Sequence, residues 1–266
     1  MSVRMPHRML LIAGAASALA VMPAAASAAA AHGNYITIDV PGAAATFAIS
    51  VNDFGVVVGS YTDAQGVSHG FIDRHGVFTA VNDPHAGTAS GQGTTVNAIN
   101  DFGVLGGTYT DATGVSHGFI DRRGVFTTVN HAHAGTAPGQ GTTLGFINDR
   151  SAVIGFYFTS RGQAVSFAGR SGRFTTVTDP AAPPFSTLAS AINDAGVIVG
   201  VYGDAQGVSH GFIDRHGAFT TLNDPLAGTA PGQGTVAFAL SNRGIIVGIY
   251  ADSHGTTHGF ELNNTP

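Results

Sequence analysis

Residues 100–130 read NDFGVLGGTYTDATGVSHGFIDRRGVFTTVN, and close variants of this stretch recur along the chain. Matched on its tyrosine, the stretch occurs five times, at intervals of 48, 48, 45 and 48 residues. The five tyrosines are Tyr61, Tyr109, Tyr157, Tyr202 and Tyr250. A period near 48 residues is that of one supersecondary unit per repeat. The sequence therefore predicts an array of five such units.

Each repeat contains four short runs rich in Val, Ile, Thr, Phe and Tyr, separated by turns that contain glycine. This pattern is typical of antiparallel strands. In the second repeat the four runs, which we call strands a, b, c and d, are Thr94–Asn100, Val104–Thr110, Val115–Asp121 and Val125–Asn130. The only long connection leads from strand d to strand a of the next repeat, as between the blades of a propeller.

The pattern predicts an all-β fold: a five-bladed β-propeller with four antiparallel strands per blade. The predicted repeats are 43–91, 92–139, 140–184, 185–232 and 233–266.

The two chain ends predict that the ring closes. Residues 32–41 align with 75–84, the end of the first repeat, so the chain is expected to begin with a strand d. The last repeat stops after its strand c, at 256–262. A strand borrowed from the N-terminus would cover the edge that this leaves exposed. We therefore expect residues 32–42 to complete the last blade, and the propeller to span 32–266.

The first 28 residues have the pattern of a bacterial secretory signal. Arg4 and Arg8 precede an apolar run at 9–22 that is too short to span a bilayer, and Ala26-Ser-Ala28 fits a cleavage site. The mature protein is expected to be secreted or periplasmic, without a membrane span, and monomeric. The chain has 16 acidic and 11 basic residues and no cysteine. Nucleic acid is therefore an unfavourable partner, and disulfides and Cys-ligated zinc are impossible.

Four His-Gly-Phe triplets lie between the Asn-Asp-x-Gly turn and the Phe-Thr-Thr strand of their repeats. They occupy 69–71, 117–119, 210–212 and 258–260. This arrangement resembles the bacterial extracellular HAF family, named after a His-Ala-Phe triplet, with Gly in place of Ala. The resemblance covers essentially the whole mature chain and implies a secreted repeat protein without an assigned activity. The third repeat departs from it, with Ser166-Phe167 at this place.

Most polar and aromatic residues that recur in the repeats are predicted to be structural. The tyrosines and the strand c phenylalanines are expected in the core. The triplet histidines are expected to hydrogen-bond backbone beside the b–c turn, with repeated ligand sites as the alternative. Of 15 Asp, all but Asp39 recur at equivalent positions, as turn formers do. With Glu261 the only Glu, no catalytic residue, cofactor or metal site is predicted; His131 and His133 alone are a weak metal signal.

The candidate ligand-binding residues lie on the d–a loops and at the start of strand a. Three loops share Gly-Thr-Ala-x-Gly-Gln-Gly, at 87–93, 135–141 and 228–234. Loops on a rigid scaffold often bind ligands, although Gly and Gln can also serve only to turn the chain, and Thr is a good strand former. The candidates are Gln92, Gln140, Gln233, His85, His131, His133, Thr46, Thr94, Thr142, Thr187 and Thr235.

The function that fits best is a non-enzymatic binding module that recognises a glycan or another extracellular surface through several repeated sites. An extracellular hydrolase or lyase, or a purely structural envelope or matrix protein, are the alternatives. The third repeat is the most divergent, so it is either a product of drift or the one unique site. Its unusual residues are Phe156, Phe158, Arg161, Ser166, Arg170 and Arg173.

Overall fold

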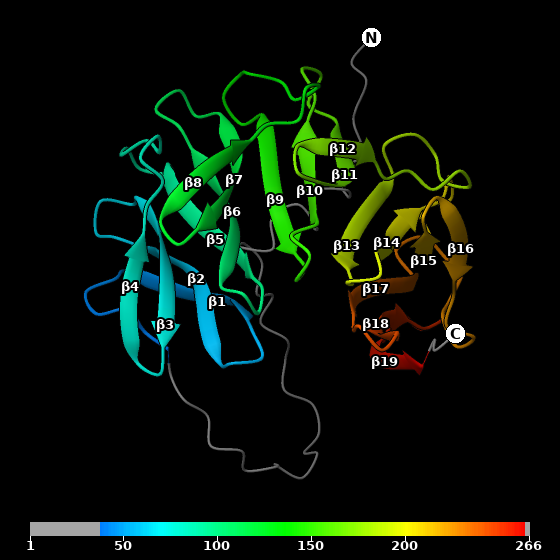
Figure 1. The fold of residues 1–266 in the computed structure, drawn as a ribbon. Helices are drawn as coiled ribbons and strands as arrows, with labels where there is room; N and C mark the ends of the chain where they lie inside the picture. Colours follow the sequence, from blue (N-terminus) through cyan, green and yellow to red (C-terminus); the bar gives the residue numbers. More distant parts are fainter. Residues whose placement is uncertain (1–37, 264–266) are drawn as a thin grey trace. The chain divides into compact units, whose positions relative to one another are not determined.

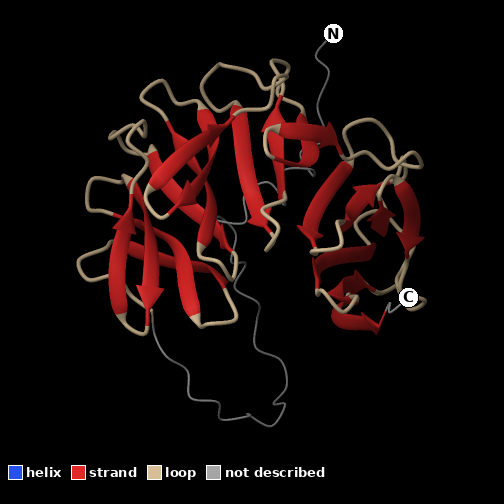
Figure 2. Ribbon diagram, in the orientation of Figure 1, coloured by secondary structure: helices blue, strands red, loops and turns tan. Residues whose placement is uncertain are grey.

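The computed structural model describes residues 38–263, which consist of strands, turns and loops without a helix (Figure 2). The compact unit begins at Asp39. The predicted signal, 1–28, and most of the predicted N-terminal strand lie outside the described residues. In the part of the chain that is described, no helix is long and apolar enough to cross a membrane.

Nineteen strands follow the predicted repeats, four in each of the first four and three in the last (Figure 1). The strands are β1 (Ala45–Val51), β2 (Val56–Thr62), β3 (Ser68–Arg74), β4 (Val77–Val81), β5 (Gly93–Ile99), β6 (Val104–Thr110), β7 (Ser116–Arg122), β8 (Val125–Val129), β9 (Gly141–Ile147), β10 (Val153–Phe158), β11 (Ala164–Arg170), β12 (Arg173–Thr176), β13 (Thr187–Ile192), β14 (Val197–Gly203), β15 (Ser209–Arg215), β16 (Ala218–Leu222), β17 (Gly234–Leu240), β18 (Ile245–Ala251) and β19 (Thr257–Asn263). The strands predicted for the second repeat differ from β5–β8 by at most one residue at either end, which confirms the repeat unit.

Within each repeat the strands pair antiparallel in chain order, as predicted. Neighbouring repeats are joined by a single parallel bridge between strand c and the next strand a, at Ser68–Gly93, Ser116–Gly141 and Ser209–Gly234. No such bridge joins β11 to β13. The strands therefore form one sheet of 12 strands, β1–β12, and one of 7 strands, β13–β19.

A glycine on strand b and a phenylalanine on strand c form the centre of each repeat. Gly107 pairs with Phe119, and a Cβ at Gly107 would collide with the phenylalanine ring and with the Thr95 carbonyl. Only glycine lets the ring lie this close to the strand. Phe119 and its equivalents Phe71, Phe167 and Phe212 are fully buried, which confirms the predicted aromatic core in the first four repeats, whereas Phe260 of the last repeat is half-buried.

The hydrophobic clusters lie between repeats as well as within them. One cluster joins Val58 and Val81 of the first repeat to Leu105 and Phe119 of the second. Another joins Ala168 of the third repeat to residues of the fourth. Each of these repeats therefore buries an apolar face against its neighbour, so a repeat depends on that neighbour for its stability.

The Asn-Asp-x-Gly turn between strands a and b carries a second link between repeats. The Asn100 Oδ1 atom accepts the backbone N–H groups of Phe102 and Val104, which closes the turn. Its Nδ2 atom donates to the Asn148 carbonyl of the next repeat, at 3.0 Å. Asn100 is 4% exposed, so this donor and acceptor are both satisfied inside the protein.

The aspartate of the same turn extends the link along the chain. Each aspartate N–H donates to the side chain of the equivalent residue one repeat later, at 2.8–3.0 Å. The series runs Asp53, Asp101, Asp149, Asp194, Asn242. Together with the asparagine bonds it forms a turn ladder that crosses all four junctions between repeats, including the one without a parallel bridge.

Ring closure stays a prediction. Among the described residues, Ile38, Asp39 and Val40 form no strand, and β19 pairs only with β18. The described strands thus form two sheets that do not close. Residues 32–37 of the strand predicted at the N-terminus are outside the described part, so the pairing with β19 is untested.

The turn ladder can be tested at Asn100, because the last repeat has Ser241 at this place. The Ser241 hydroxyl accepts the Ile245 N–H and so closes its turn, but it has no amide to donate onward. Asn100→Ser should therefore lose only the link to the next repeat, at about 0.5–1.5 kcal/mol, whereas Asn100→Ala should lose the turn cap as well. Urea unfolding of both variants measures the difference. Equal stability of the two variants and the native chain would contradict a structural role for the ladder.

Candidate ligand-binding site at the third repeat

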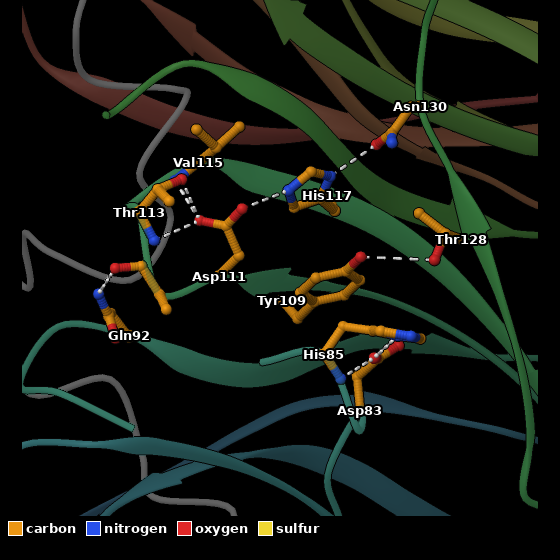
Figure 3. Close-up of polar contacts among 11 residues, drawn as sticks. Asp83, His85, Gln92, Tyr109, Asp111, Thr113, Val115, His117, Thr128 and Asn130 are labelled. Atoms are coloured by element: carbon orange, nitrogen blue, oxygen red, sulfur yellow. Dashed lines mark hydrogen bonds and ion pairs between the residues drawn. The ribbon is translucent and has the colours of Figure 1, made fainter. Parts of the chain in front are cut away.

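The triplet histidines form a repeated polar cluster, shown for the second repeat in Figure 3. The His117 Nε2 atom lies 3.1 Å from the Asp111 Oδ2 atom, and its Nδ1 atom lies 3.0 Å from the Asn130 Oδ1 atom. The imidazole ring stacks on Tyr109, with 4.8 Å between ring centroids. The first and fourth repeats have the same cluster, and the fifth has its Asp, His and Tyr members.

This cluster is structural, with partners other than those expected. Sequence reasoning predicted a bond from the ring to backbone, but the ring contacts the side chains of the turn aspartate and an asparagine. In the first, second and fourth repeats both ring nitrogens are used, so those rings have none left for a ligand. The turn aspartate is the hub: Asp111 Oδ1 accepts the Thr113 and Val115 N–H groups, which shape the b–c turn.

Hydrogen bonds determine the charge state of these aspartates. Burial alone would raise the pKa of Asp111, but the Thr113 hydroxyl, the Val115 N–H and the His117 ring together lower it well below 3.8. The pKa of Asp63 is lowered chiefly by the Val67 N–H and the His69 ring, and those of Asp204 and Asp252 are lowered by equivalent bonds. The cluster therefore contains a carboxylate at neutral pH.

The three loop glutamines are also occupied within the fold. Gln92 Oε1 accepts the Ala89 N–H at the end of the first repeat, and its Nε2 donates to the Ala112 carbonyl in the b–c turn of the second repeat. Gln140 and Gln233 make the same two bonds. The side chain lies over Gly87, where a Cβ would collide with it. The shared loop sequence thus builds a clasp between neighbouring repeats.

The strand a threonines do not form an accessible ring of hydroxyls, which corrects that part of the prediction. Thr94, Thr142, Thr187 and Thr235 are at most 4% exposed. Each Oγ1 accepts a backbone N–H from the end of the preceding repeat, at 2.9–3.1 Å, and Thr46 does the same with Val40. These hydroxyls anchor the d–a loops because a buried N–H needs an acceptor.

The three loop histidines have different environments. The His85 side chain is 69% exposed and lies 3.0 Å from Asp83. His131 is buried and stacks on Tyr157 at 4.0 Å, and burial, with the neighbouring His133, lowers its pKa. Within residues 38–263, no group of three or more His, Asp or Glu side chains is placed to share a metal ion.

The third repeat lacks the whole polar cluster. Thr159, Val165 and Thr178 replace the aspartate, histidine and asparagine, and Tyr157 stacks instead on His131 of the preceding loop. Its d–a loop is three residues shorter and lacks the glutamine clasp, and Ser166 Oγ accepts the Ala189 N–H in its place. The joint loss of the aspartate, the histidine and the asparagine is visible in the sequence. It could have indicated this site, but sequence reasoning missed it.

A pocket of about 270 Å³ lies where the cluster is missing. We call it the third-repeat pocket. It is lined by Tyr157, Thr159, Ala164, Val165, Ser166, Thr176, Val177, Thr178, Pro184, Phe185 and Thr187. Of the predicted candidates, only Thr187 lies in this lining. The pocket therefore combines six hydroxyl-bearing side chains with apolar groups.

Two features of this pocket are available to a ligand: unpaired hydroxyls and an exposed aromatic ring. Tyr109 and Tyr202 hydrogen-bond the strand d threonines Thr128 and Thr221. In the third repeat, Tyr157 and the equivalent Thr176 form no such bond among the described residues, so both hydroxyls remain available for a ligand. Phe185 is 46% exposed and has a φ of 63°, a left-handed conformation that is uncommon for a bulky residue.

No family model and no curated protein matches this chain. Similar solved structures include the SapL1 lectin in complex with alpha methyl fucoside, at 12% identity and a TM-score of 0.45, over 83% of this chain and 82% of the lectin. A six-bladed β-propeller lectin from Aleuria aurantia is similar at 10% identity and 0.42, over 82% and 72%. TolB from Acinetobacter baumannii is similar at 12% and 0.49, over 82% of this chain and 54% of TolB. Likenesses at this level assign no ligand to the chain.

The polar cluster predicts a loss of stability in acid. Because the folded pKa of Asp111 is lowered, its contribution is present above about pH 4 and is lost as the pH falls through the folded pKa. Asp111→Asn should therefore lower the free energy of unfolding most at neutral pH, and the difference from the native chain should shrink toward pH 2. Urea unfolding across this range provides the measurement. A difference that does not change with pH would contradict the prediction.

Proposed function

We propose that this chain is an exported, non-catalytic saccharide-binding protein built as a five-bladed β-propeller, with the third-repeat pocket as its ligand site. The observation that carries the proposal is the combination of available hydroxyls with an exposed aromatic ring in one pocket. A sugar ring offers hydroxyl groups around its rim and apolar C–H groups on its face. Small-molecule sites similarly combine an apolar wall with a few placed polar groups.

The size and lining of the pocket support this ligand class. Its volume of about 270 Å³ suits one sugar ring rather than a large cofactor. Tyr157, Thr176 and Thr178 offer hydroxyls that both donate and accept hydrogen bonds, as sugar hydroxyls do. Phe185 offers an aromatic face on the same pocket, and its ring is already exposed.

The lining favours binding over catalysis. Glycoside hydrolysis generally needs two carboxyl groups at a set separation. The third-repeat pocket is lined by no Asp, Glu or His. Elsewhere, the repeated b–c turn aspartates are occupied by backbone N–H groups and histidine rings. A hydrolase or lyase would need groups that this pocket does not offer.

A single principal site is better supported than several repeated sites. The multivalent version of the proposal depended on Gln92, Gln140 and Gln233, whose amides serve the clasps between repeats. The third repeat is the place where the clasp and the polar cluster are both lost. We therefore propose that its divergence reflects a function rather than drift.

Exposed apolar residues at both ends of the array support ring closure. Val51 of the first repeat is 60% exposed, whereas the equivalent Ile99 is 7% exposed. Val247 of the last repeat is 41% exposed, whereas the equivalent Val58 is fully buried. Both end faces thus have the composition of a junction between repeats. We propose that they pack on each other in the exported chain, with the N-terminal strand beside β19.

The saccharide proposal is tested with Phe185→Ala and Thr176→Val. Screening the mature protein on a glycan array identifies a binding saccharide, and calorimetry then measures its affinity. Each variant should weaken binding about fivefold to tenfold, because it removes a stacking face or a hydrogen-bonding hydroxyl. Phe102→Ala, which removes a 72% exposed phenylalanine from an a–b turn, is the matched control and should bind normally. The absence of any saccharide ligand, or turnover of one, would defeat the proposal.

Ring closure is tested by deleting residues 32–41 from the mature chain. The deletion should leave β19 with an unpaired edge and the end faces without their covering strand, so the protein should melt lower and self-associate. Differential scanning calorimetry and light scattering report both effects. A truncated chain that melts like the mature protein and stays monomeric would contradict closure.

A further inference from the structure

The junction between the third and fourth repeats contains a second pocket, next to the third-repeat pocket. It has a volume of about 510 Å³, and Thr176 and Val177 line both pockets. Two positions at which the third repeat has a smaller side chain than the other repeats account for the volume of this pocket. Ala168 replaces the isoleucine found at this place in the other four-stranded repeats, and Ala152 replaces a valine. Both alanines line the second pocket, so the junction is hollowed by missing methyl and methylene groups.

An unusual pair of arginines borders this second pocket. Arg170 ends β11 and lines the pocket, and its register partner across the hairpin is Arg173, at the start of β12. Partners in an antiparallel pair point to the same face of the sheet. Arg170 itself is not unusual, contrary to the sequence-based expectation, because the other four-stranded repeats also have an arginine here. Those repeats pair it with Val77, Val125 or Ala218, so only Arg173 is new. Like charges directly opposite each other are destabilising, so the third repeat keeps a pair that costs stability.

The charge of this arginine pair is not balanced by a carboxylate among the described residues. Every ion pair in residues 38–263 joins a histidine to an aspartate, so neither arginine has a carboxylate within salt-bridge distance. The other four-stranded repeats have an aspartate beside this arginine, and Gly169 replaces it here. Residues 140–184 contain four of the chain's 11 basic residues and only two acidic ones.

The opposite wall of the second pocket comes from the fourth repeat and includes Asp214 and His216. Asp214 Oδ1 accepts the Gly217 N–H at 2.6 Å, and the carboxylate can accept further donors. One wall therefore attracts an anionic group, and the other offers an acceptor for a hydroxyl. A ligand that carries both an oxyanion and hydroxyl groups satisfies both walls, whereas a bare anion satisfies only one.

We propose that the two adjoining pockets form one groove for an acidic saccharide. A sugar ring occupies the third-repeat pocket beside Phe185, and a carboxylate or sulfate group further along the saccharide binds Arg170 and Arg173. The guanidinium groups suit this role because their planar N–H donors match the geometry of an oxyanion. This inference rests on the proposed saccharide function and adds the charge of the ligand and the residues that recognise it.

The test compares acidic saccharides with matched neutral ones. The probes are oligogalacturonate and its methyl ester, and dextran sulfate and dextran, measured by calorimetry on the mature protein at low salt. The native chain should bind the acidic member of at least one pair tenfold or more tightly than the neutral member, since charge-assisted bonds are involved. The pair that shows the preference tells a carboxylate from a sulfate ligand. No preference in either pair would overturn the inference.

The deciding variant is Arg170→Gln combined with Arg173→Gln. It should lose the preference for the acidic probe while keeping the affinity for the neutral one, and its Tm should not fall, because a like-charge pair has been removed. Arg122→Gln combined with Arg123→Gln makes the same charge change in the second repeat and should keep the preference. A preference that survives in the Arg170, Arg173 variant would overturn the inference.

A separate measurement distinguishes failure of the groove from failure of the saccharide function. Inorganic sulfate, compared with chloride at equal ionic strength, should produce a Tm shift in the native chain beyond the general stabilisation that it gives to both the native chain and the Arg170, Arg173 variant. If no saccharide binds but this shift occurs, the oxyanion site stands and the proposed function fails. If neutral saccharides bind and the shift is absent, the proposed function stands and the arginine site is overturned.

Discussion

The turn ladder between strands a and b is the constraint on which the rest of the structure depends. One asparagine side chain closes its own turn and donates to the next repeat, and the neighbouring aspartate repeats the link with its N–H. Because the same side chain closes the turn and bonds the next repeat, the turn conformation and the contact between repeats depend on each other. The ladder crosses the junction after the third repeat at 2.8 and 3.0 Å, where the parallel bridge and the glutamine clasp are absent.

This redundancy explains how one junction can diverge while the array is kept. Each regular junction has the ladder, a parallel bridge, a clasp and a packed apolar face. The third junction keeps the ladder and much of the apolar contact, including Ala168 against Ile192 and Ile198. The polar cluster, the clasp and the bulk of an isoleucine are lost there, and two pockets take their place. Contacts between repeats are therefore lost at the place where we propose that a ligand binds.

The regular repeats show how recurring polar residues can suggest function while serving structure. His117, Gln140 and Thr142 have the chemistry of ligand-binding groups, yet their polar atoms are engaged inside the protein. Their regular spacing follows from identical junctions. In an array whose junctions are built from the same bonds, the repeat that breaks the pattern has polar groups, such as the Tyr157 and Thr176 hydroxyls, without their usual partners in the protein.

The sequence by itself determined the repeat, the strands and the aromatic core, because these depend on local turn chemistry and on alternation along single strands. The burial of Phe119 and the Asn-Asp-x-Gly turn were predicted without coordinates, whereas the glycine that faces the ring, Gly107, was found only in the structure. Only the tertiary structure decided which polar atoms are available, because the partners of Gln92, Thr94 and His117 lie in another strand, loop or repeat. The same holds for the groove. The linear sequence does not place Ala168, Arg170 and Phe185 together. They line adjoining pockets because β11, β12 and the following loop meet the fourth repeat across a junction that lacks its usual contacts.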